Sequence, residues 1–214
     1  YEYNIEQCYN KMDKIILDCT KDHPGYKKNR FFLEGDPKAI LLLELRGDTL
    51  EILEIELRAL QETIINSGLS YAAIPLWGEE IVLANELRNA GLGLLGNIVG
   101  DSKAVACIED TAVPLKQLAL YIKDFQVLMK EFNQEVVYYA HAGAGELHLR
   151  PILNLKTKKG VEDFKTITLA VAYLVKKYKG SLSGEHGDGI VRSEFIPIVV
   201  GKENYQLFKR IKKI

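Results

Sequence analysis

Cysteine is scarce in this chain. Cys8, Cys19 and Cys107 are the only three in 214 residues, and they form no CxxC pair. This odd, scattered set excludes a disulfide framework and shows no iron–sulfur or zinc-finger spacing within the chain. Buried thiols in a reducing compartment are the simplest interpretation. We therefore expect a cytoplasmic protein, either free or held peripherally at the inner membrane.

Long apolar runs and an excess of charge are also lacking. No run approaches the roughly 18 residues that a membrane helix needs, and the polar N-terminal segment YEYNIEQCYNKMDK is no signal peptide. The formal net charge of -1 gives no reason to expect nucleic acid as a partner. The sequence has no methionine at position 1 and stops within a helical pattern, FKRIKKI, so we expect a piece of a longer protein.

What is present predicts an α+β fold. Hydrophobic residues make up 47% of the chain, enough for a sizeable core. Apolar periodicity predicts an antiparallel sheet with helices packed on one face, in two α/β halves. The expected helices are residues 3–22, 49–66, 79–90, 114–128 and 161–179; the expected strands are 40–45, 71–75, 105–108 and a hairpin over 135–153. We divide the chain into an N-terminal helix with its connecting loop, 1–39, and a main domain, 40–214.

A glycine-rich segment, GLGLLG at 91–96, matches the GxGxxG pattern of dinucleotide-binding loops. That fingerprint requires a strand before it, a helix after it and an acid about 20 residues further on. Here a helical, charged segment precedes the glycines, and Glu109 and Asp110 come too early. We therefore expect a glycine-rich loop after a helix, without a nucleotide.

The hairpin EVVYYAHAGAGELHLRPIL carries the chemistry. With its turn at Ala144-Gly145, His141 lies directly opposite His148, and Tyr139 opposite Arg150, on one face of the sheet. Two imidazoles placed in this way can share a metal ion. The other face carries an ordinary core set: Val136, Tyr138, Ala140, Leu147 and Leu149.

A second glycine-rich stretch, SLSGEHGDG at 181–189, supplies further candidates. Glu185 and His186 offer a third ligand and a nearby base in one dipeptide, although a surface turn would have the same composition. Arg88, late on an expected helix, reads by itself as a solvated charge.

Four segments together resemble the C-terminal part of FAD-linked D-2-hydroxyacid dehydrogenases: ELRNAGLGLLG, ACIEDTAVP, YYAHAGAGELHLRP and KGSLSGEHGDGIVRSEF. These vanillyl-alcohol-oxidase-like flavoproteins include D-lactate dehydrogenase, the glycolate oxidase flavin subunit and D-2-hydroxyglutarate dehydrogenase. The likeness runs from about residue 40 to the end and is closest to the large branch that also carries iron–sulfur segments. It implies a cap domain, with ferredoxin-like halves, that partners an FAD domain of the same polypeptide.

The resemblance also implies roles for single residues. His141, His148 and Glu185 match the family's divalent-metal ligands, commonly for zinc, and His186 matches its catalytic base. Arg88 matches a contact to the substrate carboxylate. Arg150 stands where some relatives have a substrate-contacting asparagine. Apart from the resemblance, we expect Tyr139, on the same face of the hairpin, to add a hydrogen bond to the substrate. The residues that contact the flavin are not identified.

Two positions depart from the family pattern. A lysine that D-2-hydroxyglutarate dehydrogenases use before the strand-end Asp110 has no match, and the threonine expected four residues after Arg88 is Leu92. These differences leave the identity of the hydroxyacid open. The sequence also does not identify the electron acceptor or the oligomeric state. Two alternatives to a flavin-dependent dehydrogenase are a zinc-dependent hydrolase, with Glu146 or His186 as base, and a non-catalytic α/β binding module.

Overall fold

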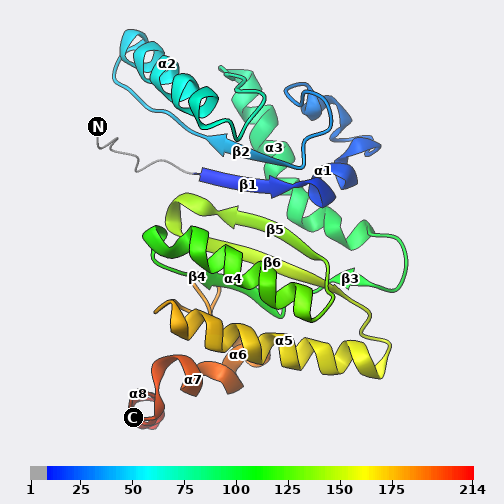
Figure 1. The fold of residues 1–214 in the computed structure, drawn as a ribbon, viewed down its shortest axis with the longest axis vertical. Coiled ribbons are helices and arrows are strands. Elements are labelled where there is room, and N and C mark those ends of the chain that lie inside the picture. Colours follow the sequence, from blue (N-terminus) through cyan, green and yellow to red (C-terminus); the bar gives the residue numbers. More distant parts are fainter. Residues whose placement is uncertain (1–8) are drawn as a thin grey trace. The chain divides into compact units, whose positions relative to one another are not determined.

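The structure, a computed structural model, describes residues 9–214 (Figure 1). The chain divides into two compact units, Tyr1–Leu94 and Leu95–Ile214; the division that the sequence suggested after residue 39 stays a prediction. All strand pairs within each unit are antiparallel across the described residues. None of the described helices is long and apolar enough to span a membrane.

The first unit is built on a short strand pair. Strands β1 (Tyr9–Asp13) and β2 (Ala39–Leu43) pair in register from Tyr9↔Leu43 to Asp13↔Ala39. The predicted helix over 3–22 is therefore wrong for residues 9–13, because backbone pairing with β2 outweighs their helical periodicity; residues 3–8 lie outside the described part of the chain. Asp13 ends the strand and caps α1 (Lys14–Lys21), its carboxylate accepting from the N–H of Ile16.

Helices complete the first unit: α2 (Leu50–Ser67) and α3 (Glu79–Leu94), preceded by the short 3-10 helix η1 (Lys27–Arg30). Residues 71–75 form no strand. Helix α3 runs on through Gly91 and Gly93, and η2 (Leu95–Asn97) follows it. The GLGLLG segment is thus largely helical, rather than the loop we expected, and it does not follow a strand as a dinucleotide-binding loop would.

The second unit places a sheet against helices α4 (Leu118–Glu131) and α5 (Lys158–Lys177) (Figure 1). The long strand β6 (Glu146–Leu153) pairs with β5 (Val136–His141) on one side, and with β4 (Ile108–Ala112) and β3 (Lys103–Ala104) on the other. In place of the predicted strand over 105–108, the structure has two short strands: β3 ends before this range and β4 begins at its last residue. The remaining short elements are η3 (Leu115–Gln117), η4 (Ala142–Ala144), α6 (Gly189–Arg192), η5 (Ser193–Phe195), α7 (Ile196–Val200) and α8 (Lys202–Ile211).

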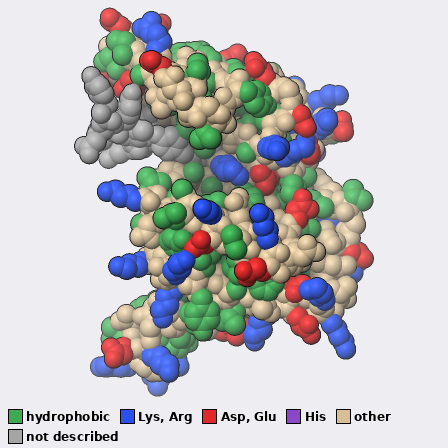
Figure 2. Space-filling model, in the orientation of Figure 1, with side chains coloured by type: hydrophobic (Ala, Val, Ile, Leu, Met, Phe, Trp, Pro, Cys, Tyr) green, Lys and Arg blue, Asp and Glu red, His purple; other side chains and the backbone are tan. Residues whose placement is uncertain are grey.

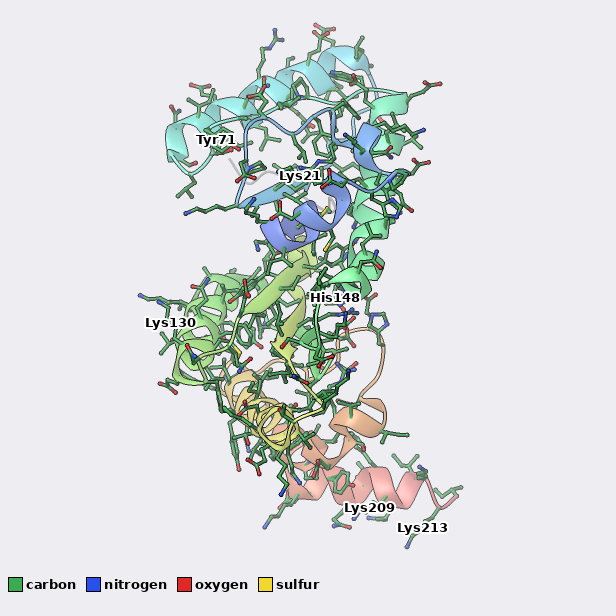
Figure 3. The ribbon with its side chains drawn as sticks, turned by 90° about the vertical axis from the view of Figure 1, so that its right-hand side faces the viewer. Lys21, Tyr71, Lys130, His148, Lys209 and Lys213 are labelled. Atoms are coloured by element: carbon green, nitrogen blue, oxygen red, sulfur yellow. The ribbon has the colours of Figure 1, made fainter. Side chains whose placement is uncertain are left out.

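The core of this unit lies between the sheet and the two helices. Leu147 and Leu149 of β6 pack with Tyr121 and Phe125 of α4 and with Ile167 of α5, all almost fully buried. His148, between the two leucines, therefore projects from the opposite face, away from α4 and its Lys130 (Figure 3). The α+β class, the antiparallel sheet and the core face of the hairpin are confirmed.

The surface carries charges of both signs. On the face drawn in Figure 2, lysine and arginine side chains are interspersed with aspartate and glutamate. This mixture agrees with the net charge of -1.

Candidate metal centre

The hairpin brings His141 and His148 to one face, although in a different register from the one expected. Tyr139 pairs with His148, and His141 with Glu146, so the predicted pairing is wrong by two residues. The cause is the connection: Ala142–Ala144 form a 3-10 turn and Gly145 takes φ 74°, so that four residues join the strands instead of two. A shift of two residues preserves strand alternation, and the imidazoles still lie diagonally adjacent, with ring centroids 5.3 Å apart.

Glu185 lies at the centre of an imidazole cluster. Its Oε1 is 3.4 Å from Nε2 of His148, and 3.6 Å from Nε2 of both His141 and His186. His141, His148 and Glu185 each offer a ligand atom, and the three atoms lie within 4.8 Å of one another. The structure therefore brings together the three residues that the sequence predicts as metal ligands, with the predicted base His186 beside them.

These separations fit a metal better than direct hydrogen bonds. A distance of 3.4–3.6 Å is long for an N–H···O bond. Ligand atoms about 2.0–2.1 Å from a tetrahedral zinc ion stand about 3.4 Å apart. Burial lowers the pKa of His148, an effect that neighbouring His141 adds to and that Glu109 and Glu185 oppose. The neutral imidazole that binds metals is thereby favoured.

Asp110 fixes the loop that carries Glu185 and His186. Its carboxylate accepts hydrogen bonds from the backbone N–H groups of Glu185 (2.9 Å) and His186 (2.8 Å) and from the hydroxyl of Ser183, while its carbonyl accepts from Gly184 (2.7 Å). Asp110 is fully buried, has φ 76° and lies where the β4–β6 register shifts. Such a bulge re-aims a side chain, and here it directs the carboxylate at the loop.

Glu146 completes an acidic cluster behind the ligands. Burial, a hydrogen bond with Asp110 and the charge of Glu185, in that order, raise the pKa of Glu146 to about 8. Burial alone would raise the pKa of Asp110, but hydrogen bonds from Glu146, Ser183 and the loop amides hold it well below its usual range. The raised pKa favours a protonated Glu146, which can donate to Asp110. A carboxylate that accepts several N–H bonds has such a lowered pKa.

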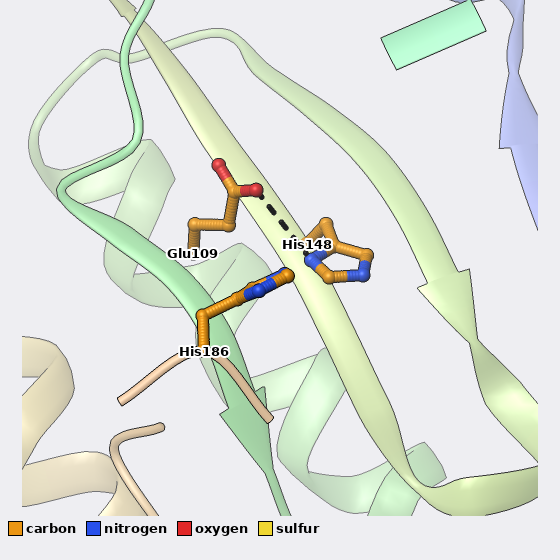
Figure 4. A group of neighbouring side chains, drawn as sticks. All are labelled: Glu109, His148 and His186. Atoms are coloured by element: carbon orange, nitrogen blue, oxygen red, sulfur yellow. Dashed lines mark ion pairs between the residues drawn. The ribbon is translucent and has the colours of Figure 1, made fainter. Parts of the chain in front are cut away.

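Glu109 and Arg150 form an ion pair next to His148. Nε and Nη2 of Arg150 donate to Glu109 at 2.5 and 2.8 Å, and Oε1 of Glu109 lies 3.6 Å from Nδ1 of His148 (Figure 4). Sequence reasoning identified Arg150 but missed Glu109 and Asp110 as site residues. The signal was available in the acidic pair that directly follows the expected apolar strand 105–108, because carboxylates buried at its end require partners.

Tyr139 and Arg88, which the sequence predicts as substrate contacts, lie in different units of the structure. Tyr139 packs its ring 5.6 Å from that of His148 and is almost fully buried. Arg88 lies on α3 in the first unit, half-buried, and donates through Nη1 to Asn89 at 2.8 Å. Tyr139 therefore lies against the histidine cluster. The position of Arg88, by contrast, is described only within the first unit.

Comparison with known proteins gives the family. A model of FAD linked oxidases, C-terminal domain, matches residues 10–214. A D-2-hydroxyglutarate dehydrogenase of Pseudomonas putida is 41% identical over 210 residues, which cover 93% of this chain and 20% of the relative. A D-lactate dehydrogenase of Archaeoglobus fulgidus is 31% identical over 53% of this chain and 25% of its own length. The glycolate oxidase subunit GlcD of Bacillus subtilis is 24% identical over 84% and 37%.

The chain thus spans about a fifth of the length of the Pseudomonas putida relative. The match to the family model, by contrast, extends over nearly the whole chain. The chain belongs to the family of FAD-linked oxidase C-terminal domains.

Proposed function

We propose that this chain is the substrate- and metal-binding cap of a flavin-dependent dehydrogenase that oxidises a D-2-hydroxyacid to the 2-oxoacid. The names of the relatives support the reaction class. The observation that carries the proposal is the carboxylate oxygen of Glu185 with the Nε2 atoms of His141 and His148 at 3.6 and 3.4 Å. D-lactate, glycolate and D-2-hydroxyglutarate are the substrate types to test.

The residues present fit a divalent metal. Two imidazoles and one carboxylate form a donor set of the kind that catalytic zinc sites use, with a further position left for substrate. His141, His148 and Glu185 would hold the ion, and a metal bound there would polarise the substrate's oxygens and lower the pKa of its 2-hydroxyl.

The protein's own groups would handle the proton and the carboxylate. His186, with its side chain 57% exposed, is the proposed acceptor of the 2-hydroxyl proton. The C2 hydrogen leaves with its electron pair as hydride, for which FAD, held mainly by another domain of the same polypeptide, supplies the acceptor. A guanidinium orients a carboxylate through paired donors.

Arg88 and Arg150 are the proposed carboxylate contacts. Two donors of Arg150 already bond to Glu109, so a substrate carboxylate would have to compete for them or use Nη1. Tyr139 is proposed to add a hydrogen bond. An iron–sulfur cluster, if the complete protein carries one, would lie outside this chain.

Stopped-flow reduction of the flavin in the complete protein tests the proposal. A panel of D-2-hydroxyacids should bleach the flavin absorbance, with one clearly preferred. His186→Gln should slow bleaching by about 10²–10⁴-fold while metal content is unchanged, and His23→Gln, in the other unit, should match wild type. A complete protein without flavin, or one whose flavin no D-2-hydroxyacid reduces, refutes the proposal and leaves the zinc hydrolase or the binding module.

A further inference from the structure

The proposed metal site uses only one of the two ring nitrogens of His148. Nε2 faces Glu185 at 3.4 Å, whereas Nδ1 finds no hydrogen-bond partner within the described part of the chain. The His148 side chain is only 3% exposed, so water cannot easily satisfy that atom. Oε1 of Glu109 lies 3.6 Å from Nδ1, within ion-pair distance but beyond a hydrogen bond (Figure 4).

The sheet places Glu109 there by its register. Glu109 of β4 pairs with His148 of β6, so the two side chains leave the same face directly opposite each other. Arg150 follows two residues after His148 and shares that face. One strand thus presents the imidazole and the guanidinium to one carboxylate of its neighbour.

Arg150 restrains that carboxylate. It donates through Nε to Oε2 and through Nη2 to Oε1, a two-point contact that fixes the plane of the carboxylate as well as its position. The side chains of Glu109 and Arg150 are 11% and 20% exposed, so solvent competes little for these bonds. The oxygen that accepts from Nη2 is also the one that faces Nδ1 of His148.

The separation of 3.6 Å is longer than a hydrogen bond, but the negative charge of the Glu109 carboxylate still attracts an N–H group, so it favours the imidazole tautomer with hydrogen on Nδ1. That tautomer leaves the lone pair on Nε2, the nitrogen that faces the proposed ligands. Metal-binding histidines commonly depend on such a partner for their other nitrogen, and losing it weakens metal binding about 10–100-fold.

We propose that Glu109, braced by Arg150, is a positioning residue that holds the proton of His148 on Nδ1 and keeps Nε2 available to a divalent metal. This inference rests on the proposed metal site. In this role Arg150 acts through Glu109 and needs no contact with the substrate.

Zinc affinity and histidine tautomers, measured in the 214-residue chain, test the inference. Competition with a chromophoric chelator should show zinc binding about 10–100-fold weaker in Glu109→Gln than in wild type. Glu185 faces Nε2 at 3.4 Å, so the tautomer is measured in a metal-free Glu185→Gln background. There, ¹⁵N spectra should show the proton of His148 on Nδ1, and adding Glu109→Gln should shift it toward Nε2. Glu194→Gln is the matched control, because Glu194 is an exposed partner of Lys165 away from the site, and it should behave as wild type.

A double variant controls for the effect of leaving the charge of Arg150 unpaired. Glu109→Gln leaves Arg150 without its counter-charge, whereas Glu109→Gln/Arg150→Gln removes both charges and should still lose zinc affinity. Wild-type affinity in the double variant would overturn the inference, because the defect would then come from the unpaired arginine. Wild-type affinity and an unchanged tautomer in Glu109→Gln would overturn it as well.

His141→Ala separates the inference from the site on which it rests. If His141→Ala loses zinc and Glu109→Gln does not, only the role of Glu109 fails. If His141→Ala binds zinc as wild type does, the metal site fails and the role of Glu109 falls with it.

Discussion

Asp110 accepts a hydrogen bond of 2.9 Å from the backbone N–H of Glu185, so a buried strand residue holds the exposed loop residue at the centre of the histidine cluster. The same carboxylate bonds His186 at 2.8 Å. The proposed ligand and the proposed base thus depend on one anchor, whose positive φ and bulge no apolar pattern reveals.

Asp110→Asn should destabilise the chain by about 1.5–3 kcal/mol, because hydrogen bonds to a buried charged group contribute that much. Asparagine tolerates the positive φ, so the substitution isolates the carboxylate. Urea denaturation measures the loss, and amide hydrogen exchange should show faster exchange at Glu185 and His186. Asp101→Asn, at an exposed ion pair with Lys156, is the control and should change little; equal stability of both variants would contradict the anchoring role.

Glu146 should make the metal-free chain less stable as pH rises. In the folded state its pKa is raised to about 8 from an ordinary 4.5. Between these values the unfolded chain binds fewer protons than the folded one, so the free energy of unfolding falls with increasing pH. Glu146→Gln removes the titration and keeps a donor for Asp110. Urea denaturation at pH 5.5, 6.5 and 7.5 should show a shallower decline in the variant, and identical declines would refute this assignment.

Two glycines should respond in opposite ways to alanine. A Cβ at Gly145 would lie 2.2 Å from the carbonyl oxygen of Val113, and φ there is positive, so Gly145→Ala should cost at least about 2 kcal/mol. At Gly93 a Cβ meets nothing within 4 Å, and the residue is helical, so Gly93→Ala should be neutral or stabilising by up to about 1 kcal/mol. Thermal unfolding compares them; a destabilised Gly93→Ala would contradict the helical assignment of the GLGLLG segment.

The helices and the hairpin could be predicted from the sequence because periodicity alone defines them. α2, α3, α4 and α5 lie close to their expected positions. Strand β1 could not be predicted, because its pairing with β2 is a contact over about 30 residues that leaves no local signal. The hairpin register depended on the conformation of Gly145, yet the shared face of His141 and His148 survived since an even shift preserves alternation.

The residues of the candidate site also differ in whether the sequence alone could identify them. His141, His148, Glu185 and His186 could be selected from motifs and resemblance, and the structure brings them together. Glu109, Asp110 and Glu146 act through side-chain hydrogen bonds, charge and a bulge that only the assembled sheet creates. Sequence reasoning therefore found the proposed ligands and the proposed base. It missed Glu109 and Asp110, and it named Glu146 only as a base of the alternative hydrolase.

Zinc binding by single-residue variants of the 214-residue chain tests whether His141, His148 and Glu185 form a metal site. His141→Gln, His148→Gln and Glu185→Gln should each weaken zinc binding by at least about tenfold, because each removes a ligand. His23→Gln is the matched control: His23 lies in the other unit, where its Nδ1 accepts from the N–H of Gly25. Only this control should keep wild-type affinity. Equal affinity in all four variants would show that His141, His148 and Glu185 do not hold the metal.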